Sequence, residues 1–509
     1  MQSGWVRHSL LPHTPKLFSD LLYDFASVER FYARPEPAIA YPEERRAGIV
    51  EALRVQNPGH PLLEQLAQPG TAVVVTGQQV GLFGGPAYTI YKALTAVKTA
   101  RETGAVPVFW LATEDHDLAE IDHVWVFDAQ QNPVRLRANG GPVGVPVGGV
   151  ELAAPPVDEL RAALEGFPFG GDVTERVAAA YRPGRTMGAA FTELLRNLLG
   201  QFGVLTLDPL RPEIRQLAAP MLAQAAGRAA ELVGGILERN RELATAGYHA
   251  QVHAEPNSSL LFLLDRGRRR PLRYREGRFF AGEEAFTAEE LAARAADLSP
   301  NALLRPVIQD YLLPTAAFIG GPAELAYMAQ SETIYRKLLG RMPAIAPRAF
   351  FTLLDARAAK LTARYELELA DCFAGFDALR ERIAGRLTPP ELTAEFRKAA
   401  TAASRAVDQL RGPLARFDPT LASALARGRA RILHQIARVE KKAAREALRR
   451  DERAERETTY VYNLLYPRKQ LQERFYGILP FAARHGLDLI GRLYENIRLD
   501  STDHQVLAV

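Results

Sequence analysis

The sequence predicts an α/β protein with a doubly wound parallel sheet, followed in the chain by a long α-helical coiled coil. The sheet is predicted by two apolar runs, 72–75 and 106–112, because strands buried on both faces have this composition. A Gly-rich loop and a helix at 88–101 join the two runs, which gives a β-loop-α-β unit. The coiled coil is predicted by the stretch 423–457, which contains no proline and repeats apolar residues at nearly heptad spacing.

The first 70 residues are predicted to form an N-terminal helical segment that packs on the core. Apolar residues recur at helical spacing after Thr14, and a second helix is expected at 43–55, ending before Asn57. Residues 71–127 are then expected to form the first half of the core.

Residues 128–185 hold many Gly and Pro residues and little periodicity, which predicts an insertion subdomain with short strands. Residues 186–354 are predicted to form the second half of the core with a further insertion. The expected elements are helices at 186–201 and 211–246, strands and a hairpin within 250–280, and strands at 203–208, 304–314, 316–321 and 344–352.

Residues 355–458 are predicted to form the coiled coil, with a helix at 355–384 as the antiparallel partner of the long helix. The apolar seam of the long helix consists of Leu425, Ile432, Ile436, Val439 and Ala443. Residues 459–509 mix apolar and charged residues and are expected to form C-terminal helices that return to the core.

Composition limits the function classes. The 509 residues carry 63 Lys and Arg against 59 Asp and Glu, and a net charge of +4 does not require nucleic-acid binding. The single cysteine, Cys372, excludes an internal disulfide and a Cys-rich zinc site, and it fits a reducing compartment. No signal-peptide pattern follows Met1, and no run approaches the ~20 apolar residues of a membrane span. We therefore expect a cytoplasmic protein without membrane or nucleic-acid partners.

The Gly-rich turn between the first strand and its helix is the strongest candidate site. The backbone N–H groups of such a turn, together with the helix dipole, attract phosphate or carboxylate groups. The segment matches neither GxGxxG nor GxxxxGK[ST], so neither nucleotide fingerprint applies. A tight structural turn with packing glycines is the alternative interpretation. The candidate binding residues are Thr76, Gly77, Gln78, Gln79, Gly84, Gly85, Tyr88 and Lys92.

Three acids and a histidine, Glu114 to Asp117, follow the strand 106–112 directly. Ligands in open α/β sheets bind outside the carboxyl ends of the strands, so this cluster is a second candidate site. His116 is a candidate general acid or base acting with Asp115 or Asp117, and Glu114 is a candidate binding residue. A metal site formed by His116, Asp117 and His123 is an alternative, because imidazole and carboxylate are usual zinc ligands. Helix capping and ordinary surface charge are the structural alternatives.

The sequence Gly84-Gly85-Pro86-Ala87 recurs as Gly320-Gly321-Pro322-Ala323 after another predicted strand. In both copies a tyrosine follows five residues after the proline, namely Tyr91 and Tyr327. We expect the second helix N-terminus to face the same edge of the sheet, with Gly320 and Gly321 in a binding role. The upstream residues Arg305, Gln309 and Asp310 are expected within reach. Two similar helices without a binding role are the alternative.

Long motifs identify a family resemblance that covers essentially the whole chain. The segments are TGQQVGLFGGPAYTIYKA at 76–93, PVFWLATEDHDLAEIDHV at 107–124 and SPNALLRPVIQDYLLPTAAFIGGPAELAYMAQ at 299–330. They resemble the bacillithiol biosynthesis cysteine-adding enzymes of the BshC family. The opening LPHTPKLFSDLLYDF and the closing YPRKQLQERFYGILPF are also similar to that family.

The resemblance implies a Rossmann-like parallel-sheet core with connecting-peptide insertions and an α-helical coiled coil that mediates homodimerisation. It implies a ligase that joins L-cysteine, through its carboxyl group, to the amine of glucosaminyl-malate. Nucleotide binding has been associated with the family, so ATP or ADP is the expected cofactor, with Mg²⁺ as a further candidate. No tightly bound metal is expected.

The residues fit this reaction, because amide formation from a free carboxylate is uphill and the acid must be activated at a preorganised anion site. We assign the nucleotide or substrate anion to 76–88 and Lys92, and the substrate amine to Asp115, His116 and Asp117. The alternatives are a metal-dependent hydrolase using His116, Asp117 and His123, and a non-catalytic, nucleotide-binding coiled-coil dimer. RNA binding is a third alternative.

Overall fold

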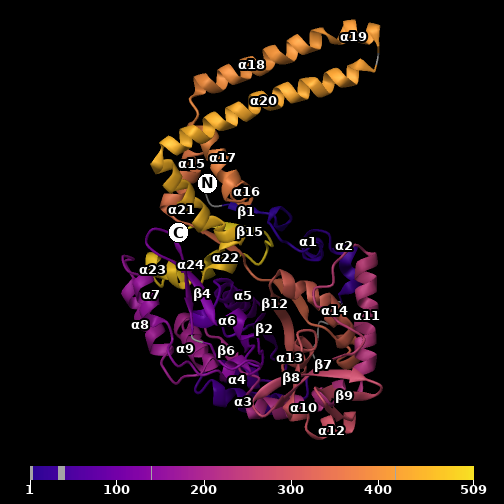
Figure 1. The fold of residues 1–509 in the computed structure, drawn as a ribbon. Helices are drawn as coiled ribbons and strands as arrows, with labels where there is room; N and C mark the ends of the chain where they lie inside the picture. Colours follow the sequence, from indigo (N-terminus) through magenta and orange to yellow (C-terminus); the bar gives the residue numbers. More distant parts are fainter. Residues whose placement is uncertain (1–3, 33–39, 139, 419) are drawn as a thin grey trace. The chain divides into compact units, whose positions relative to one another are not determined.

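A computed structural model describes residues 4–32, 40–138, 140–418 and 420–509 (Figure 1). The chain divides into two compact units. The core unit comprises residues 4–352 and 473–506, and the helical unit comprises residues 353–472 together with 507–509. Along the sequence, the helical unit is therefore an insertion into the core unit. The finer domain boundaries expected from the sequence stay predictions.

The core unit is built on a five-stranded parallel sheet. Its strands, from one edge to the other, are β13 (Ala344–Pro347), β12 (Thr315–Gly320), β2 (Val73–Gln78), β3 (Val106–Leu111) and β6 (Leu205–Leu207). The chain starts in the middle at β2, runs outward to β3 and β6, and returns to β12 on the other side of β2. This order confirms the doubly wound class and places the topological switch point between β2 and β12.

The sheet is buried on both faces, which explains why its strands appear as unbroken apolar runs in the sequence. Val73 and Val75 of β2 contribute to the main hydrophobic core. The intervening Val74 packs on the opposite face, in a small cluster that contains Ala96 of α5 (Tyr88–Thr103). One strand therefore serves two layers, and its first half, Val73 to Val75, is apolar on both faces.

The other elements of the core unit follow the sequence closely at the N-terminus and in the hairpin region. The N-terminal elements are β1 (Gly4–Val6), α1 (Lys16–Tyr23), α2 (Phe25–Val28), α3 (Glu43–Gln56) and α4 (Leu62–Ala67). A five-stranded sheet, confirming the predicted hairpin at 250–280, consists of β10 (Glu284–Phe286), β9 (Arg278–Ala281), β8 (Arg268–Arg275), β7 (Ser258–Asp265) and β11 (Leu298–Pro300). The remaining elements are α9 (Met187–Leu199), α12 (Ala288–Ala293), α14 (Pro322–Leu338), α22 (Gln472–Phe475), α23 (Leu479–His485), α24 (Leu489–Asn496) and β15 (His504–Ala508).

Two strand predictions in the core unit are wrong. The run 304–314 forms a helix, α13 (Arg305–Leu312), because a short buried apolar run has no periodicity that distinguishes strand from helix. The run 344–352 is divided between β13 and β14 (Phe351–Leu354), which belong to different sheets.

Two further predictions give the wrong number or the wrong type of secondary-structure elements. The predicted helix 211–246 is two helices, α10 (Pro212–Gly227) and α11 (Ala229–Thr245), which meet at the non-helical Arg228. The segment 128–185, predicted to hold short strands, contains more helix than strand. It contains α7 (Val157–Ala163), α8 (Gly170–Ala180) and one strand, β5 (Pro133–Arg137), which pairs with β4 (His123–Phe127) after the short α6 (Leu118–Ile121).

The helical unit contains the long helix predicted from the heptad pattern, as α20 (Leu421–Arg450). The predicted extension to residue 457 is interrupted, because the Asp451 side chain accepts the Ala454 N–H at 3.0 Å and starts a new helix, α21 (Glu452–Leu465). The predicted partner 355–384 is broken into α15 (Ala356–Arg364), α16 (Leu369–Phe373) and the start of α17 (Phe376–Leu387).

Of these three helices, α17 packs against α20, which confirms part of the predicted pairing. The far part of α20 is accompanied by the hairpin arm α18 (Pro390–Gln409) and α19 (Arg411–Phe417), as Figure 1 shows, so the pairing also extends to residues later in the sequence than expected. Among the residues that the structure describes, no helix is both long enough and apolar enough to cross a bilayer.

Two buried histidines lie together in the core unit, where β1 pairs with β15. His8 packs edge-on against Phe350 at a ring-centroid distance of 4.2 Å, and the His504 ring is 6.2 Å from the His8 ring. Burial lowers the pKa of His8 to about 3 and that of His504 to about 4. Both imidazoles are therefore neutral in the folded protein at pH values where an unfolded histidine, with a pKa near 6.5, takes up a proton.

We predict that stability falls as the pH drops below 6.5 and continues to fall toward pH 4. Each neutral histidine makes the unfolded state bind one more proton, so the pair contributes a slope of about 2.7 kcal/mol per pH unit. His504→Gln should remove about half of that slope in urea unfolding between pH 7 and 5. The exposed His253→Gln is the matched control for the substitution itself. Parallel slopes for wild type and His504→Gln would contradict this explanation.

Candidate functional site

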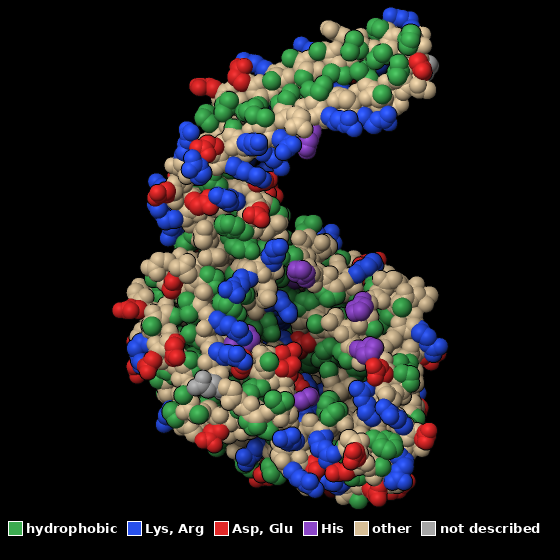
Figure 2. Space-filling model, in the orientation of Figure 1, with side chains coloured by type: hydrophobic (Ala, Val, Ile, Leu, Met, Phe, Trp, Pro, Cys, Tyr) green, Lys and Arg blue, Asp and Glu red, His purple; other side chains and the backbone are tan. Residues whose placement is uncertain are grey.

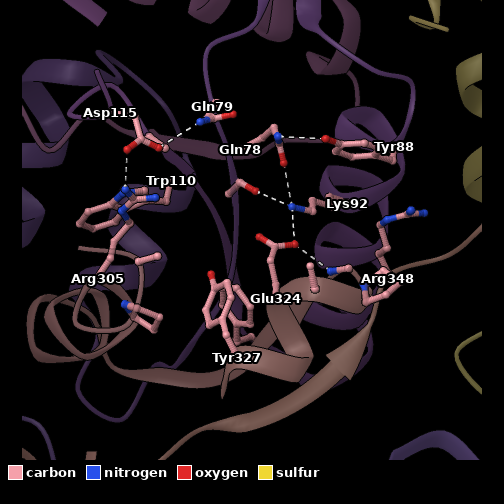
Figure 3. Close-up of a pocket in the computed structure, with 18 of the residues that line it drawn as sticks. Gln78, Gln79, Tyr88, Lys92, Trp110, Asp115, Arg305, Glu324, Tyr327 and Arg348 are labelled. Carbon is pink, nitrogen blue, oxygen red and sulfur yellow. Dashed lines mark hydrogen bonds and ion pairs between the residues drawn. The ribbon is translucent and has the colours of Figure 1, made fainter. Parts of the chain in front are cut away.

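A cavity of about 420 Å³ opens at the switch point, where β2 and β12 end (Figure 3). Ligands in open α/β sheets bind at this position, and the volume lies within the ~300–1,000 Å³ of small-molecule sites. The wall combines the end of β2, the first turns of α5 and the start of α14. Figure 2 shows basic and acidic side chains gathered around a hollow on this face of the core unit.

Lys92, on α5, is the buried cation of this pocket. Its Nζ donates to the Gly77 carbonyl at 3.0 Å and to Gln78 Oε1 at 2.8 Å, and it lies 2.5 Å from Glu324 Oε2. Burial lowers the pKa of Lys92, and the negative charge of Glu324 opposes that shift. The three partners use all three ammonium donors, so Lys92 contributes positive potential to the pocket and holds its two sides together.

Three cations lie around the ring of Tyr88. The ring centroid is 5.6 Å from Lys92 Nζ, 5.2 Å from the Arg348 guanidinium and 5.6 Å from the Arg474 guanidinium. Burial raises the pKa of the Tyr88 hydroxyl, which accepts a hydrogen bond from Gln78 at 3.3 Å. Arg474 has no ion-pair partner among the described residues. This end of the pocket is therefore positive and suited to an anionic group.

Asp115 lines the opposite end of the pocket and is held by three donors. Its Oδ1 accepts from Arg269 and Arg305, each at 3.2 Å, and its Oδ2 accepts from Gln79 at 3.1 Å. Burial alone would raise the pKa of Asp115, but the charges of Arg305 and Arg269 lower it below the ordinary value. Glu120 also accepts from Gln79, at 2.9 Å, so two carboxylate side chains border this end of the pocket.

The rest of the predicted acidic cluster lies outside the pocket wall. His116 Nδ1 lies 3.0 Å from Arg269 Nη1, and burial and that guanidinium lower the pKa of His116. Asp117 is exposed at the start of α6. Glu114 is buried against Arg215 at 3.3 Å, and burial raises the pKa of its carboxyl. Of the three residues predicted to be catalytic, only Asp115 reaches the pocket.

Backbone N–H groups of the Gly-rich loop donate hydrogen bonds to carbonyls within the protein. The N–H groups of Gly84 and Gly85 donate to the carbonyls of Gly81 and Leu82, and the Ala87 N–H donates to Tyr476. Neither Gly84 nor Gly85 lines the pocket. The helix α5 begins at Tyr88, as predicted. Thr76 is also turned away from the pocket, since its hydroxyl donates to the Ile319 carbonyl at 2.8 Å and ties β2 to β12.

The second GGPA sequence lies at the pocket, and the first does not. Gly321 lines the cavity, and its N–H donates to Glu324 Oε2 at 2.8 Å in a capping interaction at the start of α14. Gly320 is buried beside Leu325. Tyr327 lines the cavity, whereas the corresponding Tyr91 is buried against Phe351. Of the three upstream residues expected here, Arg305 and Gln309 line the cavity, whereas Asp310 does not, and its carboxylate accepts from the Tyr335 hydroxyl.

Sequence reasoning missed three charged residues of the pocket: Glu324, Arg348 and Arg474. Glu324 follows the second GGPA sequence at the capping position N3, a signal that could have identified it. Arg348 lies between two short strands that were interpreted as one. Arg474 lies on the returning C-terminal segment, more than a hundred residues later, and no local pattern links it to the pocket.

The residues of the metal-site alternative do not gather. His123 pairs with Asp122 at 3.0 Å, on β4, while His116 contacts Arg269. Among the described residues, no three His, Cys, Asp or Glu side chains are arranged to hold a metal ion. The structure therefore does not favour the metal-dependent hydrolase.

The fold and the site define a doubly wound α/β protein with a charged, ligand-sized pocket at its switch point and an inserted α-helical unit. Residues 7–349 match the family described as bacillithiol biosynthesis BshC, N-terminal Rossmann-like domain. Residues 351–509 match its C-terminal coiled-coil domain. The chain belongs to the BshC family, which confirms the resemblance and the predicted fold class.

Close relatives match over their full length. A protein of Solibacter usitatus is 53% identical over 100% of both chains. A protein of Koribacter versatilis is 38% identical over 95% of this chain and 96% of its own. A protein of Salinibacter ruber is 32% identical over 97% and 96%, respectively. Each carries the name "Putative cysteine ligase BshC".

We predict that Gly77→Ala destabilises the core unit by about 1–3 kcal/mol through overpacking. A Cβ at Gly77 would lie 2.7 Å from the Trp110 carbonyl oxygen, so β2 and β3 would have to separate beside Lys92. The matched control is Gly234→Ala on α11, where a Cβ meets nothing within 4 Å and helix propensity favours alanine by up to about 1 kcal/mol. Urea unfolding of both variants tests this, and a Gly77→Ala protein as stable as wild type would contradict it.

Proposed function

We propose that this protein is a cysteine ligase that joins L-cysteine, through its carboxyl group, to the amine of glucosaminyl-malate. The observation that carries the proposal is the placing of charged groups in the switch-point pocket: Arg474 and the paired Lys92 and Arg348 lie at one end, and the carboxylates of Asp115 and Glu120 lie beside Arg305 at the other. The two substrates bring carboxylates and amines, which are the groups that such a pocket distinguishes. The names of the full-length relatives support the same reaction class.

The positive end, at Lys92, Arg348 and Arg474, is assigned to anionic groups, either substrate carboxylates or the phosphates of a nucleotide. The acidic end, at Asp115 and Glu120, is assigned to a substrate ammonium group. This assignment replaces the Gly-rich loop as the proposed anion site, since the N–H groups of Gly84, Gly85 and Ala87 already donate to carbonyls and neither glycine lines the pocket. His116 contacts Arg269, a partner of Asp115, and is proposed to act only through that contact.

ATP is the proposed source of activation, because a free carboxylate does not form an amide in water without a leaving group. The donors at the positive end fit an anionic group such as a phosphate, and Mg²⁺ is the expected companion of a nucleotide. The single cysteine of the chain fits a reducing compartment, so we place the reaction in the cytoplasm.

Mass spectrometry of purified protein with cysteine, glucosaminyl-malate, ATP and Mg²⁺ tests the reaction. We expect an amide product that disappears when any one component is omitted, with release of AMP or ADP identifying the activated intermediate. Arg474→Ala should reduce turnover about tenfold or more, because it removes a cation that has no internal partner among the described residues. Product formed without ATP would contradict the proposed activation, and no product under any combination would contradict the ligase assignment.

Homodimerisation through the helical unit is the second part of the proposal. Ile432 and Val439 lie seven residues apart on α20 and are 43% and 55% exposed. Residues at this spacing share one face of a helix, and exposed apolar residues on such a face are typical of a coiled-coil seam. The internal hairpin with α18 leaves these side chains available to a second copy.

We predict that the double variant Ile432→Glu and Val439→Glu is monomeric while its helix content is unchanged. Charges placed at the seam repel across the interface but remain solvated in the monomer. Sedimentation velocity measures the change, and Lys442→Glu, an exposed charge change on the same helix, is the control. A double variant that sediments like wild type would place the interface elsewhere or show that wild type is itself monomeric.

A further inference from the structure

The wall of the pocket contains a guanidinium that uses only some of its hydrogen-bond donors within the described residues. Arg348, directly after β13, is almost fully buried. Its Nη1 donates to the Ala349 carbonyl at 2.8 Å and to Glu473 Oε2 at 2.9 Å, and its Nη2 donates to Glu473 Oε1 at 2.6 Å. These bonds use three of the five guanidinium donors. The Nε–H and the second Nη2–H have no partner among the described residues.

The two unused donors share one edge of the guanidinium plane. Two parallel N–H groups on such an edge match the two oxygens of a carboxylate, which is the strongest neutralising contact that arginine makes. The edge is next to Gly321 of the pocket wall, where an added Cβ would lie 3.6 Å from Arg348 Nε. Gly321 has φ −87°, so its backbone does not require glycine. Its missing side chain leaves the space beside the unused edge open.

Glu473 fixes the orientation of that edge. The Arg348 and Glu473 side chains are each about 1% exposed, and Glu473 Oε2 also accepts the Phe351 N–H at 3.1 Å. Burial alone would raise the pKa of Glu473, but the charge and hydrogen bonds of Arg348 lower it, so the carboxylate stays ionised. A carboxylate with these contacts is not itself available to a ligand. Its effect is to hold Arg348 in one orientation before the ligand arrives.

We propose that Glu473 is a positioning residue that presents the Nε/Nη2 edge of Arg348 to one carboxylate of a dicarboxylate. The dicarboxylate is the malyl group of the acceptor, so the inference rests on the proposed function. Arg474, the next residue in the chain, lies over the same Tyr88 ring as Arg348 and supplies the cation for the second carboxylate. One turn of backbone thus provides both the positioning carboxylate and a binding cation.

The test is calorimetric titration of L-malate into the full-length protein, which does not require turnover. We expect Glu473→Gln to weaken malate binding about tenfold or more, because a neutral amide no longer fixes the guanidinium. Arg348→Lys should weaken it similarly, since lysine lacks the two-donor edge. The double variant should bind no more weakly than Arg348→Lys alone, within about twofold, because Glu473 acts only through Arg348.

The matched control is Glu332→Gln, which weakens a comparably buried ion pair with Arg239 at 2.7 Å, away from the pocket. It should lower the unfolding temperature to a similar degree and leave malate affinity unchanged. Gly321→Ala provides a second route that leaves the ion pair intact. Its methyl group occupies the space beside Arg348 Nε and should weaken malate binding severalfold, even if Glu473→Gln does not fold.

Unchanged malate binding in Glu473→Gln would overturn the proposal. If Glu473→Gln does not fold, unchanged malate binding in Gly321→Ala would overturn it. Equal loss of binding in Glu332→Gln would also overturn it, because the effect would then be one of general stability. An active ligase that binds no malate would overturn the positioning role while leaving the proposed function intact. Malate binding that depends on Glu473, in a protein that forms no amide, would support this inference and refute the ligase assignment.

Discussion

The buried ion pair between Lys92 and Glu324 is the interaction on which the pocket depends. Lys92 belongs to the helix that follows β2, and Glu324 belongs to the helix that follows β12. The pair therefore joins the two halves of the sheet where the strand order reverses. A buried ammonium is stable only when its donors are all used, and the Gly77 carbonyl and the Gln78 side chain complete the set. Because Glu324 also accepts the Gly321 N–H, the same contact sets the start of α14 and the shape of the pocket wall.

The parallel sheet was predictable because buried strands have few acceptable sequences, and the first half of β2 and the whole of β3 are such apolar runs. The site was only partly predictable. Asp115 and Gln79 follow their strands within a few residues, and Lys92 lies in the first turns of the helix that follows β2, so the rule that ligands bind at the carboxyl edge of a sheet identified them. Arg348 and Arg474 could not be found in this way, because their place depends on how distant segments return to the edge. The run 304–314 shows the same limit for secondary structure, since its burial conceals its helical period.

Two copies of one short sequence illustrate why a motif does not define a site. The loop before α5 packs into the interior of the protein. Phe83 is buried and has a φ of 51°, and the Tyr181 hydroxyl donates to the Gly81 carbonyl. Its amides are used by neighbouring carbonyls, so its glycines serve a tight turn. The loop before α14 is shorter, because Pro322 begins the helix directly after β12, and Gly321 stays at the cavity. The four residues are identical in the two copies. What differs is the number of residues between each strand and the helix that follows it.

The order of segments along the chain gives the positive end of the pocket an unusual construction. The core unit is left near Thr352 and re-entered at Glu473, so the whole helical unit lies in sequence between Arg348 and Glu473. These two residues form the buried, bidentate ion pair in the pocket wall. Glu473 also accepts the Phe351 N–H, close to the point where the chain leaves the core unit. The two segments by which the chain leaves and re-enters the core unit are thus joined by the Glu473 carboxylate, which also contacts Arg348. A displacement of either segment would turn the guanidinium edge, because a bidentate contact tolerates little rotation. Because Glu473 contacts both Arg348 and the Phe351 N–H, the place where the helical unit is inserted and the orientation of the guanidinium depend on one buried carboxylate.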